Sequence, residues 1–176
     1  MTFHKLLIAN RGEIACRIIK SAHEMGISCV AVYTNADSES PFVRQADEAI
    51  KLSDTYLNGK EIIEAAIQTG AQAIHPGYGF LSENAKFSKI CTEHKIKFIG
   101  PSPEMIEKMG DKATAVSTMN LAKVPTIPGS GGAVENEDDA IKIASKIGFP
   151  VMVKASAGGG GKGMRAVWNK ADFKKS

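Results

Sequence analysis

The chain has 176 residues, 43% of which are hydrophobic, and its formal net charge is only +3. This composition is typical of a globular chain with room for one sizeable domain and part of another. The dispersed charge and the absence of a long apolar run argue against nucleic acid or a membrane as partners.

Strand and helix signals alternate through the first hundred residues. We expect strands at residues 6–9, 29–33, 73–74 and 97–99, with helices at 13–25 and around 62–67. Strands separated by helices of this length predict a parallel sheet that is covered on both faces. Ligands are then expected beyond the carboxyl ends of the strands. We expect this first domain to span residues 1–100.

The predicted helix at 13–25 has two distinct faces. Its apolar stripe contains Ile14, Ile18, Ala22 and Met25. A polar stripe on the same helix contains Arg17, Lys20 and Glu24. The polar stripe is either a solvated face or an interface, and the pattern alone leaves both possibilities open.

The second half of the chain changes character twice. Residues 101–124 carry helical signals only and predict a helical linker, whereas proline and glycine at 124–132 break the pattern. A helix through Ile147 follows, and we expect these residues to form its buried face: Ala140, Ile143, Ala144 and Ile147. One helix and two strands cannot close a core of their own. We therefore expect residues 125–176 to form a truncated unit or to borrow surface from a partner.

A run of four glycines lies between lysines at residues 154–165, in the sequence KASAGGGGKGMR. Apolar segments at 149–153 and 164–168 flank the run and predict a β-hairpin. Glycine backbone amides can approach phosphate oxygens closely, and the lysines add positive charge, so a polyphosphate ligand is indicated. A Walker-type P-loop is excluded, because Lys162 is followed by glycine and a strand. A mobile hairpin tip without a ligand is the alternative.

The turn after the first strand has the sequence IANRGEIA, at residues 8–15. Only one glycine is present where dinucleotide-binding proteins carry three, so a dinucleotide site is disfavoured. Asn10 and Glu13 can serve instead as a helix cap and a first-turn charge.

A second turn, IHPGYGFLSEN at residues 74–84, leads from a strand into a helix at the ligand-facing edge. The alternative is a tight turn in which His75 is satisfied internally and Ser82 caps the helix. Lys112 lies in a first helical turn, where its charge opposes the helix dipole. Lys112 is therefore either a contact for an anionic ligand or an ordinary exposed lysine.

Three cysteines stand at wide spacing and form neither a disulfide framework nor a metal-ligand pattern: Cys16, Cys29 and Cys91. The first apolar segment, residues 5–9, has the length of a strand and no feature of a signal or transit peptide. We therefore expect the cytoplasm as the compartment and no metal site.

Five motifs together resemble the N-terminal part of biotin carboxylase: IANRGEIA (8–15), IHPGYGFLSEN (74–84), FIGP (98–101), MGDK (109–112) and KASAGGGGKGMR (154–165). That enzyme is the ATP-dependent ligase component of acetyl- and propionyl-CoA-type biotin-dependent carboxylases, in the ATP-grasp superfamily. The resemblance covers nearly the whole chain. It implies a Rossmann-like (pre-ATP-grasp) domain, a helical linker and the start of an ATP-grasp lid.

The resemblance also implies a reaction. ATP and Mg²⁺ activate bicarbonate to carboxyphosphate, and the carboxyl group then passes to biotin on a carrier domain. The implied ATP-binding residues are Lys112, Lys154, Gly159, Gly160, Gly161, Gly163 and Met164. Tyr78 and Gly79 correspond to positions near the biotin and bicarbonate pocket, and Arg17, Lys20 and Glu24 to a homodimer face. The implied partners are a biotin carboxyl carrier domain and a carboxyltransferase.

The chain ends inside the expected lid, before the magnesium ligands and the catalytic base of the family. We therefore expect the catalytic residues beyond Ser176, and no turnover by the isolated chain. The alternative is a non-catalytic dimerisation or regulatory module derived from the same fold.

Overall fold

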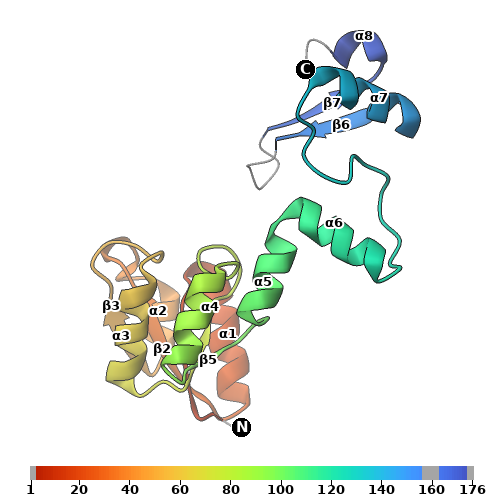
Figure 1. Ribbon diagram of the computed structural model, residues 1–176. Helices are drawn as coiled ribbons and strands as arrows, with labels where there is room; N and C mark the ends of the chain where they lie inside the picture. Colours follow the sequence, from red (N-terminus) through yellow and green to blue (C-terminus); the bar gives the residue numbers. More distant parts are fainter. Residues whose placement is uncertain (1–2, 156–162, 174–176) are drawn as a thin grey trace. The chain divides into compact units, whose positions relative to one another are not determined.

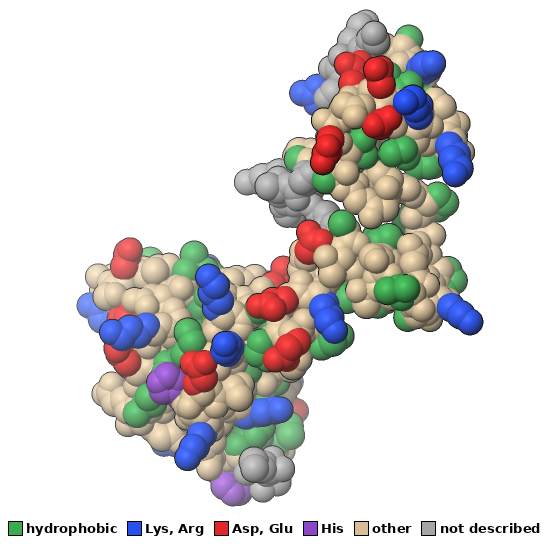
Figure 2. All heavy atoms as spheres, in the orientation of Figure 1, with side chains coloured by type: hydrophobic (Ala, Val, Ile, Leu, Met, Phe, Trp, Pro, Cys, Tyr) green, Lys and Arg blue, Asp and Glu red, His purple; other side chains and the backbone are tan. Residues whose placement is uncertain are grey.

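The computed structural model describes residues 3–155 and 163–173, and the chain divides into two compact units (Figure 1). The N-terminal unit ends at Glu107 and the C-terminal unit begins at Lys108, within one helix. The sequence-based limits at residues 100 and 124 stay predictions. On the face drawn in Figure 2, Lys and Arg side chains are interspersed with Asp and Glu side chains on both units.

A five-stranded parallel sheet forms the centre of the N-terminal unit, as the alternating pattern predicted. Its strands are β1 (Lys5–Ile8), β2 (Ser28–Tyr33), β3 (Glu48–Lys51), β4 (Ala73–His75) and β5 (Lys97–Phe98), in the order β3-β2-β1-β4-β5. Strand β3 was not predicted, because this edge strand is mostly exposed and lacks an apolar run. Its partner is β2, where Val30 lies opposite Glu48.

Helices cover both faces of this sheet (Figure 1). The elements are α1 (Gly12–Glu24), the short 3-10 helix η1 (Asn35–Asp37), α2 (Pro41–Gln45), α3 (Gly59–Thr69), α4 (Ala85–Glu93) and α5 (Pro103–Gly110). Buried side chains of α1 and α2 pack on one face, and those of α3, α4 and α5 pack on the other. Each fully buried Leu, Ile or Phe contributes about 1.5–3 kcal/mol through the hydrophobic effect.

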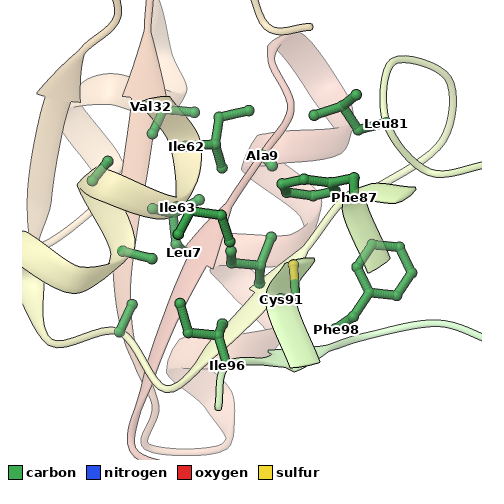
Figure 3. Packing of buried hydrophobic residues seen from close by; sticks show 14 of the residues in the cluster. Leu7, Ala9, Val32, Ile62, Ile63, Leu81, Phe87, Cys91, Ile96 and Phe98 are labelled. Carbon is green, nitrogen blue, oxygen red and sulfur yellow. The ribbon is translucent and has the colours of Figure 1, made fainter. Parts of the chain in front are cut away.

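The packing of the α3 and α4 face is shown in Figure 3. Leu7 of β1 meets Ile62 and Ile63 of α3, while α4 contributes Phe87. The rings of Phe87 and Phe98 pack edge to face, with centroids 6.1 Å apart. This cluster fixes α4 and the turn that precedes it against the centre of the sheet.

The amphipathic pattern of α1 is confirmed for Ile14, Ile18 and Ala22, which are buried. Met25 was wrongly assigned to the same stripe, because its side chain is 73% exposed. The helix ends at Glu24 and Met25 is its C-cap residue, so the helical spacing no longer applies there.

The C-terminal unit contains α6 (Lys112–Leu121), α7 (Glu137–Ile147), β6 (Val151–Lys154), β7 (Met164–Val167) and α8 (Lys170–Phe173). Strands β6 and β7 pair antiparallel, which confirms the predicted hairpin. In α7 the buried residues are Ile141 and Ala144, whereas the predicted Ile147 is exposed. Ile147 is the last residue of α7, and the chain leaves the helix at Gly148.

Candidate functional site

The carboxyl ends of β1 and β4 lie side by side at the centre of the sheet. Ile8 is in register with His75, and the amide of Ala9 donates to the His75 carbonyl at 2.9 Å. From these two strands the chain continues in opposite directions across the sheet, to β2 and to β5. Such a switch point is the usual position for a ligand site in parallel α/β folds.

Asn10 joins the two turns that leave these strands. Its buried amide nitrogen donates to the carbonyls of Pro76 at 2.7 Å and Tyr78 at 2.8 Å. The interpretation of Asn10 as a helix cap was wrong, because Arg11 is the N-cap residue of α1 and no side chain makes the capping bond. Asn10 instead fixes the shape of the second turn.

Gly77 makes this contact possible. Its φ is +65°, and a Cβ atom built on it would lie 2.5 Å from the Asn10 amide nitrogen. A side chain at Gly77 would therefore displace Asn10 and also strain the backbone.

Tyr78 and Gly79 lie at the surface of the second turn and line a shallow hollow of about 290 Å³, together with residues 10–14. The Tyr78 hydroxyl donates to the carboxylate of Glu13, which lies in the first turn of α1 as predicted. This hydrogen bond lowers the pKa of Glu13 and raises the pKa of Tyr78. The charge of Arg17 acts in the opposite direction on the pKa of Tyr78. The hollow thus combines a phenol, a carboxylate and nearby positive charge.

The buried carboxylate of Asp37 holds the first turn through its contact with Arg11. Asp37 is 3% exposed, and its carboxylate accepts hydrogen bonds from Arg11 Nε at 2.7 Å and the Tyr56 hydroxyl at 2.7 Å. The hydrogen bond from Arg11 is the main cause of the lowered pKa of Asp37. Burial, followed by the bond to Asp37, raises the pKa of Tyr56 to about 12.

The Tyr56 ring also packs against Phe80, with centroids 5.2 Å apart, where Phe80 has a φ of +41°. The Asp37 network therefore reaches both turns of the site. Sequence reasoning missed it, because its members lie on separate elements and follow no periodic pattern.

The His75 side chain forms a hydrogen bond inside its own turn, as the tight-turn alternative predicted. Its Nδ1 accepts the amide of Gly77 at 3.0 Å, and burial followed by the charge of Arg17 lowers its pKa. The same alternative was wrong about Ser82, since Asn84 is the N-cap of α4 and accepts the amide of Phe87 at 2.9 Å.

The described part of the hairpin in the C-terminal unit carries three of the predicted ATP-binding residues, Lys154, Gly163 and Met164. Lys154 ends β6 opposite Met164, the first residue of β7, and both side chains are exposed. The Ala155 amide donates to the carbonyl of Gly163 at 2.9 Å, where φ is +70°. Gly159, Gly160 and Gly161 lie outside the described residues.

Lys112 is the first residue of α6, but its side chain lies outside the described part of the structure. The preceding Asp111 caps this helix by accepting the amide of Thr114 at 2.7 Å. The backbone of Lys112 and the hairpin belong to the same unit.

The predicted interface residues share the exposed face of α1. Arg17, Lys20 and Glu24 are exposed, and Lys20 and Glu24 form an i,i+4 pair with 4.0 Å between Nζ and Oε1. These residues and Gln45 of α2 border a hollow of about 680 Å³ with a mainly apolar lining.

The fold and the position of its turns place the N-terminal unit among Rossmann-like domains with a ligand edge at the carboxyl ends of the strands. The family described as biotin carboxylase, N-terminal domain, matches residues 2–106. The chain therefore belongs to the biotin carboxylase family. Residues 111–176 match a second family, described as the ATP-binding domain of the carbamoyl-phosphate synthase L chain.

Two curated relatives illustrate the similarity. The biotin carboxylase of Nostoc sp. is 54% identical over 180 residues, which cover 99% of this chain and 40% of the relative. The mitochondrial propionyl-CoA carboxylase alpha chain of Rattus norvegicus is 53% identical, over 96% of this chain and 24% of the relative. The chain thus spans less than half of the length of these relatives.

Two solved structures illustrate the similarity in fold. The biotin carboxylase domain dimer of Hydrogenobacter thermophilus 2-oxoglutarate carboxylase, in complex with MgADP, ADP and bicarbonate, has a TM-score of 0.92 at 49% identity. The Campylobacter jejuni biotin carboxylase–β,γ-ATP complex has a TM-score of 0.93 at 48% identity. Each match covers 99% of this chain and 40% of the other. A non-catalytic regulatory module is therefore not the favoured alternative.

No helix in the described residues is both long enough and apolar enough to cross a membrane.

Proposed function

We propose that this chain forms the N-terminal part of an ATP-dependent biotin carboxylase of the ATP-grasp type. The enzyme would use ATP and bicarbonate to carboxylate carrier-bound biotin through carboxyphosphate. The observation that carries the proposal is the order of elements along one chain: a parallel sheet with two joined motif turns, followed by a hairpin that flanks a glycine run. This order matches solved biotin carboxylases over 99% of the chain.

In this proposal the hairpin binds the phosphates of ATP. Lys154 stands at the end of β6 with an exposed side chain, and it forms no ion pair with any described residue, so its ammonium group can meet a phosphate directly. Gly163 and the glycines 159–161 supply backbone amides, Met164 contributes an apolar contact, and Lys112 supplies a second positive charge. Charge-assisted hydrogen bonds of this kind are the strong contacts of phosphate sites.

Magnesium accompanies ATP in the proposed reaction and neutralises phosphate charge when it is bound. Among the described residues, the one group of three His, Cys, Asp or Glu side chains close enough to share an ion lies in the N-terminal unit. We therefore assign no magnesium ligand to the described part of the hairpin unit.

The turns after β1 and β4 form the proposed biotin and bicarbonate side of the site. Tyr78 and Gly79 border the hollow, and the hydrogen bond to Glu13 holds the phenol in place. Bicarbonate is an anion, and the charge of Arg17 would favour it near this edge.

A biotin carboxyl carrier domain, a carboxyltransferase and a second copy of the chain are the proposed partners, and the cytoplasm is the proposed compartment. The three cysteines, all within described segments, are free thiols, which suits a reducing environment. The dimer face would be the α1 surface that carries Arg17, Lys20 and Glu24.

Nucleotide binding tests the ATP assignment directly. We expect the Lys154→Ala variant to bind MgATP at least about tenfold more weakly than the wild-type chain in calorimetric titrations, because a charged hydrogen bond contributes about 1.5–3 kcal/mol. Lys170→Ala is the matched control, since Lys170 is an exposed lysine of α8 in the same unit. Equal affinities for the two variants would overturn the role of Lys154.

Sedimentation tests the dimer face. Glu24→Lys should shift the chain from dimer to monomer. Glu64→Lys should not, although Glu64 forms a similar i,i+4 pair with Lys60 on α3. A dimer that survives Glu24→Lys would exclude this face.

A further inference from the structure

Three side chains with metal-binding groups meet at the opposite edge of the sheet from the candidate site. His23 lies in the last turn of α1, Cys29 is near the start of β2, and Asp47 directly precedes β3. Because β2 and β3 are parallel neighbours, their first residues lie at the same edge. Neither the two motif turns nor the hairpin uses this cluster, and of its three residues His23 also lines the hollow beside the proposed dimer face.

The ligand atoms of the three side chains are close together. The sulfur of Cys29, a ring nitrogen of His23 and a carboxylate oxygen of Asp47 all lie within 4.8 Å of one another. His23 Nε2 and Asp47 Oδ2 are 2.9 Å apart. The cluster therefore offers one sulfur, one nitrogen and one oxygen ligand within the reach of a single ion.

The three side chains of the cluster differ in how deeply they are buried. Cys29 is completely buried and packs among the core residues under α1, whereas the side chains of His23 and Asp47 are 40% and 48% exposed. An ion would thus meet the two exposed groups first and reach the buried sulfur once the contact between His23 and Asp47 opens.

Asp47 is already held in place by its neighbours. Its Oδ2 accepts the backbone amide of Cys29 at 2.7 Å and also faces His23. These contacts lower the pKa of Asp47, so the carboxylate is ionised at neutral pH. Within the described residues both contacts use Oδ2, which leaves Oδ1 available to an incoming ion.

We propose that His23, Cys29 and Asp47 form a binding site for a zinc ion. Zinc accepts sulfur, nitrogen and oxygen ligands in one tetrahedral shell, and a water molecule would complete the four positions. The ion would replace the contact between His23 and Asp47, and the thiol proton of Cys29 would pass to solvent.

The buried thiol sets the main cost of binding. Burial, with a smaller contribution from Asp47, raises the pKa of Cys29 to about 11, so the thiol is protonated in the absence of an ion. A coordinated thiol loses its proton, because the charge of the ion stabilises the thiolate. The three ligands come from separate elements and therefore form no metal-ligand pattern in the sequence.

The competing explanation is a plain His–Asp pair that orients the start of β3 and binds no ion. Cobalt distinguishes the two explanations, because Co²⁺ replaces Zn²⁺ and gives a sulfur-to-metal charge-transfer absorption when a thiolate binds it. We expect this absorption when the intact chain is titrated with Co²⁺, and its loss when Zn²⁺ is added.

Two variants identify the ligands. Cys29→Ser should abolish the absorption. His23→Gln should weaken Co²⁺ binding at least about tenfold, although glutamine keeps a hydrogen-bonding group at an exposed position. Cys16→Ser and His94→Gln are the matched controls and should leave the titration unchanged.

A second measurement covers the case in which Cys29→Ser does not fold. Zn²⁺ should raise the Tm of the wild-type chain and of His94→Gln, but not that of His23→Gln, because an ion that binds only the folded state stabilises it. No charge-transfer absorption in the wild-type chain would overturn the proposal. An absorption that is lost in Cys16→Ser would overturn it equally.

Discussion

Gly77 is the residue on which the shape of the candidate site depends most directly. We expect Gly77→Ala to destabilise the chain by about 1–3 kcal/mol more than Gly70→Ala, measured by urea unfolding. Both glycines have nearly the same positive φ, +65° and +67°, so the strain of a left-handed alanine is matched. A Cβ at Gly70 meets nothing within 4 Å, whereas at Gly77 it collides with Asn10. Equal losses for the two variants would show that the contact with Asn10 is not tight.

Asp37 should make part of the stability depend on pH. Its pKa in the folded state is lowered, chiefly by the hydrogen bond from Arg11, relative to an ordinary value of 3.8. The stabilisation is therefore fully present above about pH 4 and is lost as the pH falls through the folded-state pKa. We expect Asp37→Asn to cost about 1–3 kcal/mol at pH 7, and the difference from wild type to shrink in acid.

Urea unfolding at a series of pH values measures this difference. Glu48→Gln is the control, because Glu48 forms an exposed ion pair with Lys5 and should contribute less than about 1 kcal/mol. A deficit of Asp37→Asn that stays the same from pH 7 to pH 3 would contradict a role for the charge.

Residue patterns could predict some of the site but not all of it. The two motif turns were located correctly, because each directly follows a strand with a clear apolar signal. The contacts of Asn10 with Pro76 and Tyr78 could not be predicted, since they depend on the neighbouring positions of β1 and β4 in the sheet. The same holds for Arg11, which meets Asp37 only after the chain has folded.

At the scale of elements, helix α4 links the second turn to the core. Asn84 begins this helix by accepting the Phe87 amide, and Phe87 is 2% exposed. We expect Asn84→Ala to destabilise the chain by about 1 kcal/mol, because an uncapped helix leaves a backbone amide without a partner. Asn84→Asp keeps an acceptor at the same position and should unfold close to wild type. A similar loss in both variants would show that the cap is not the cause.

The elements themselves were largely predictable, for physical reasons. Central strands such as β1 and β2 are buried on both sides and therefore have continuous apolar runs. Edge strand β3 has only a partly buried Ile50 and gives no such signal. The shifted face of α7 has a different cause, because a short helix on a small core needs few buried positions, here Ile141 and Ala144.

At the scale of the whole molecule, the two units differ in how much apolar surface they bury. The N-terminal unit has two extensive clusters of buried side chains on the two faces of its sheet. In the C-terminal unit the buried hydrophobic residues among those described are Ile141, Ala144 and Val167. We therefore expect the amides of β1 and β4 to exchange with solvent more slowly than those of β6 and β7.

Native-state hydrogen exchange on core variants of each unit tests whether the two units unfold independently of each other. Leu7→Ala removes a fully buried side chain of β1, at a cost of about 3–5 kcal/mol, and should accelerate exchange in β1, β2 and β4. Exchange in β6 and β7 should stay at the wild-type rate. Val167→Ala should give the reverse pattern, because Val167 is fully buried in the C-terminal unit. If Leu7→Ala accelerated exchange equally in both units, they would unfold as one cooperative body, and the division between Glu107 and Lys108 would have no energetic meaning.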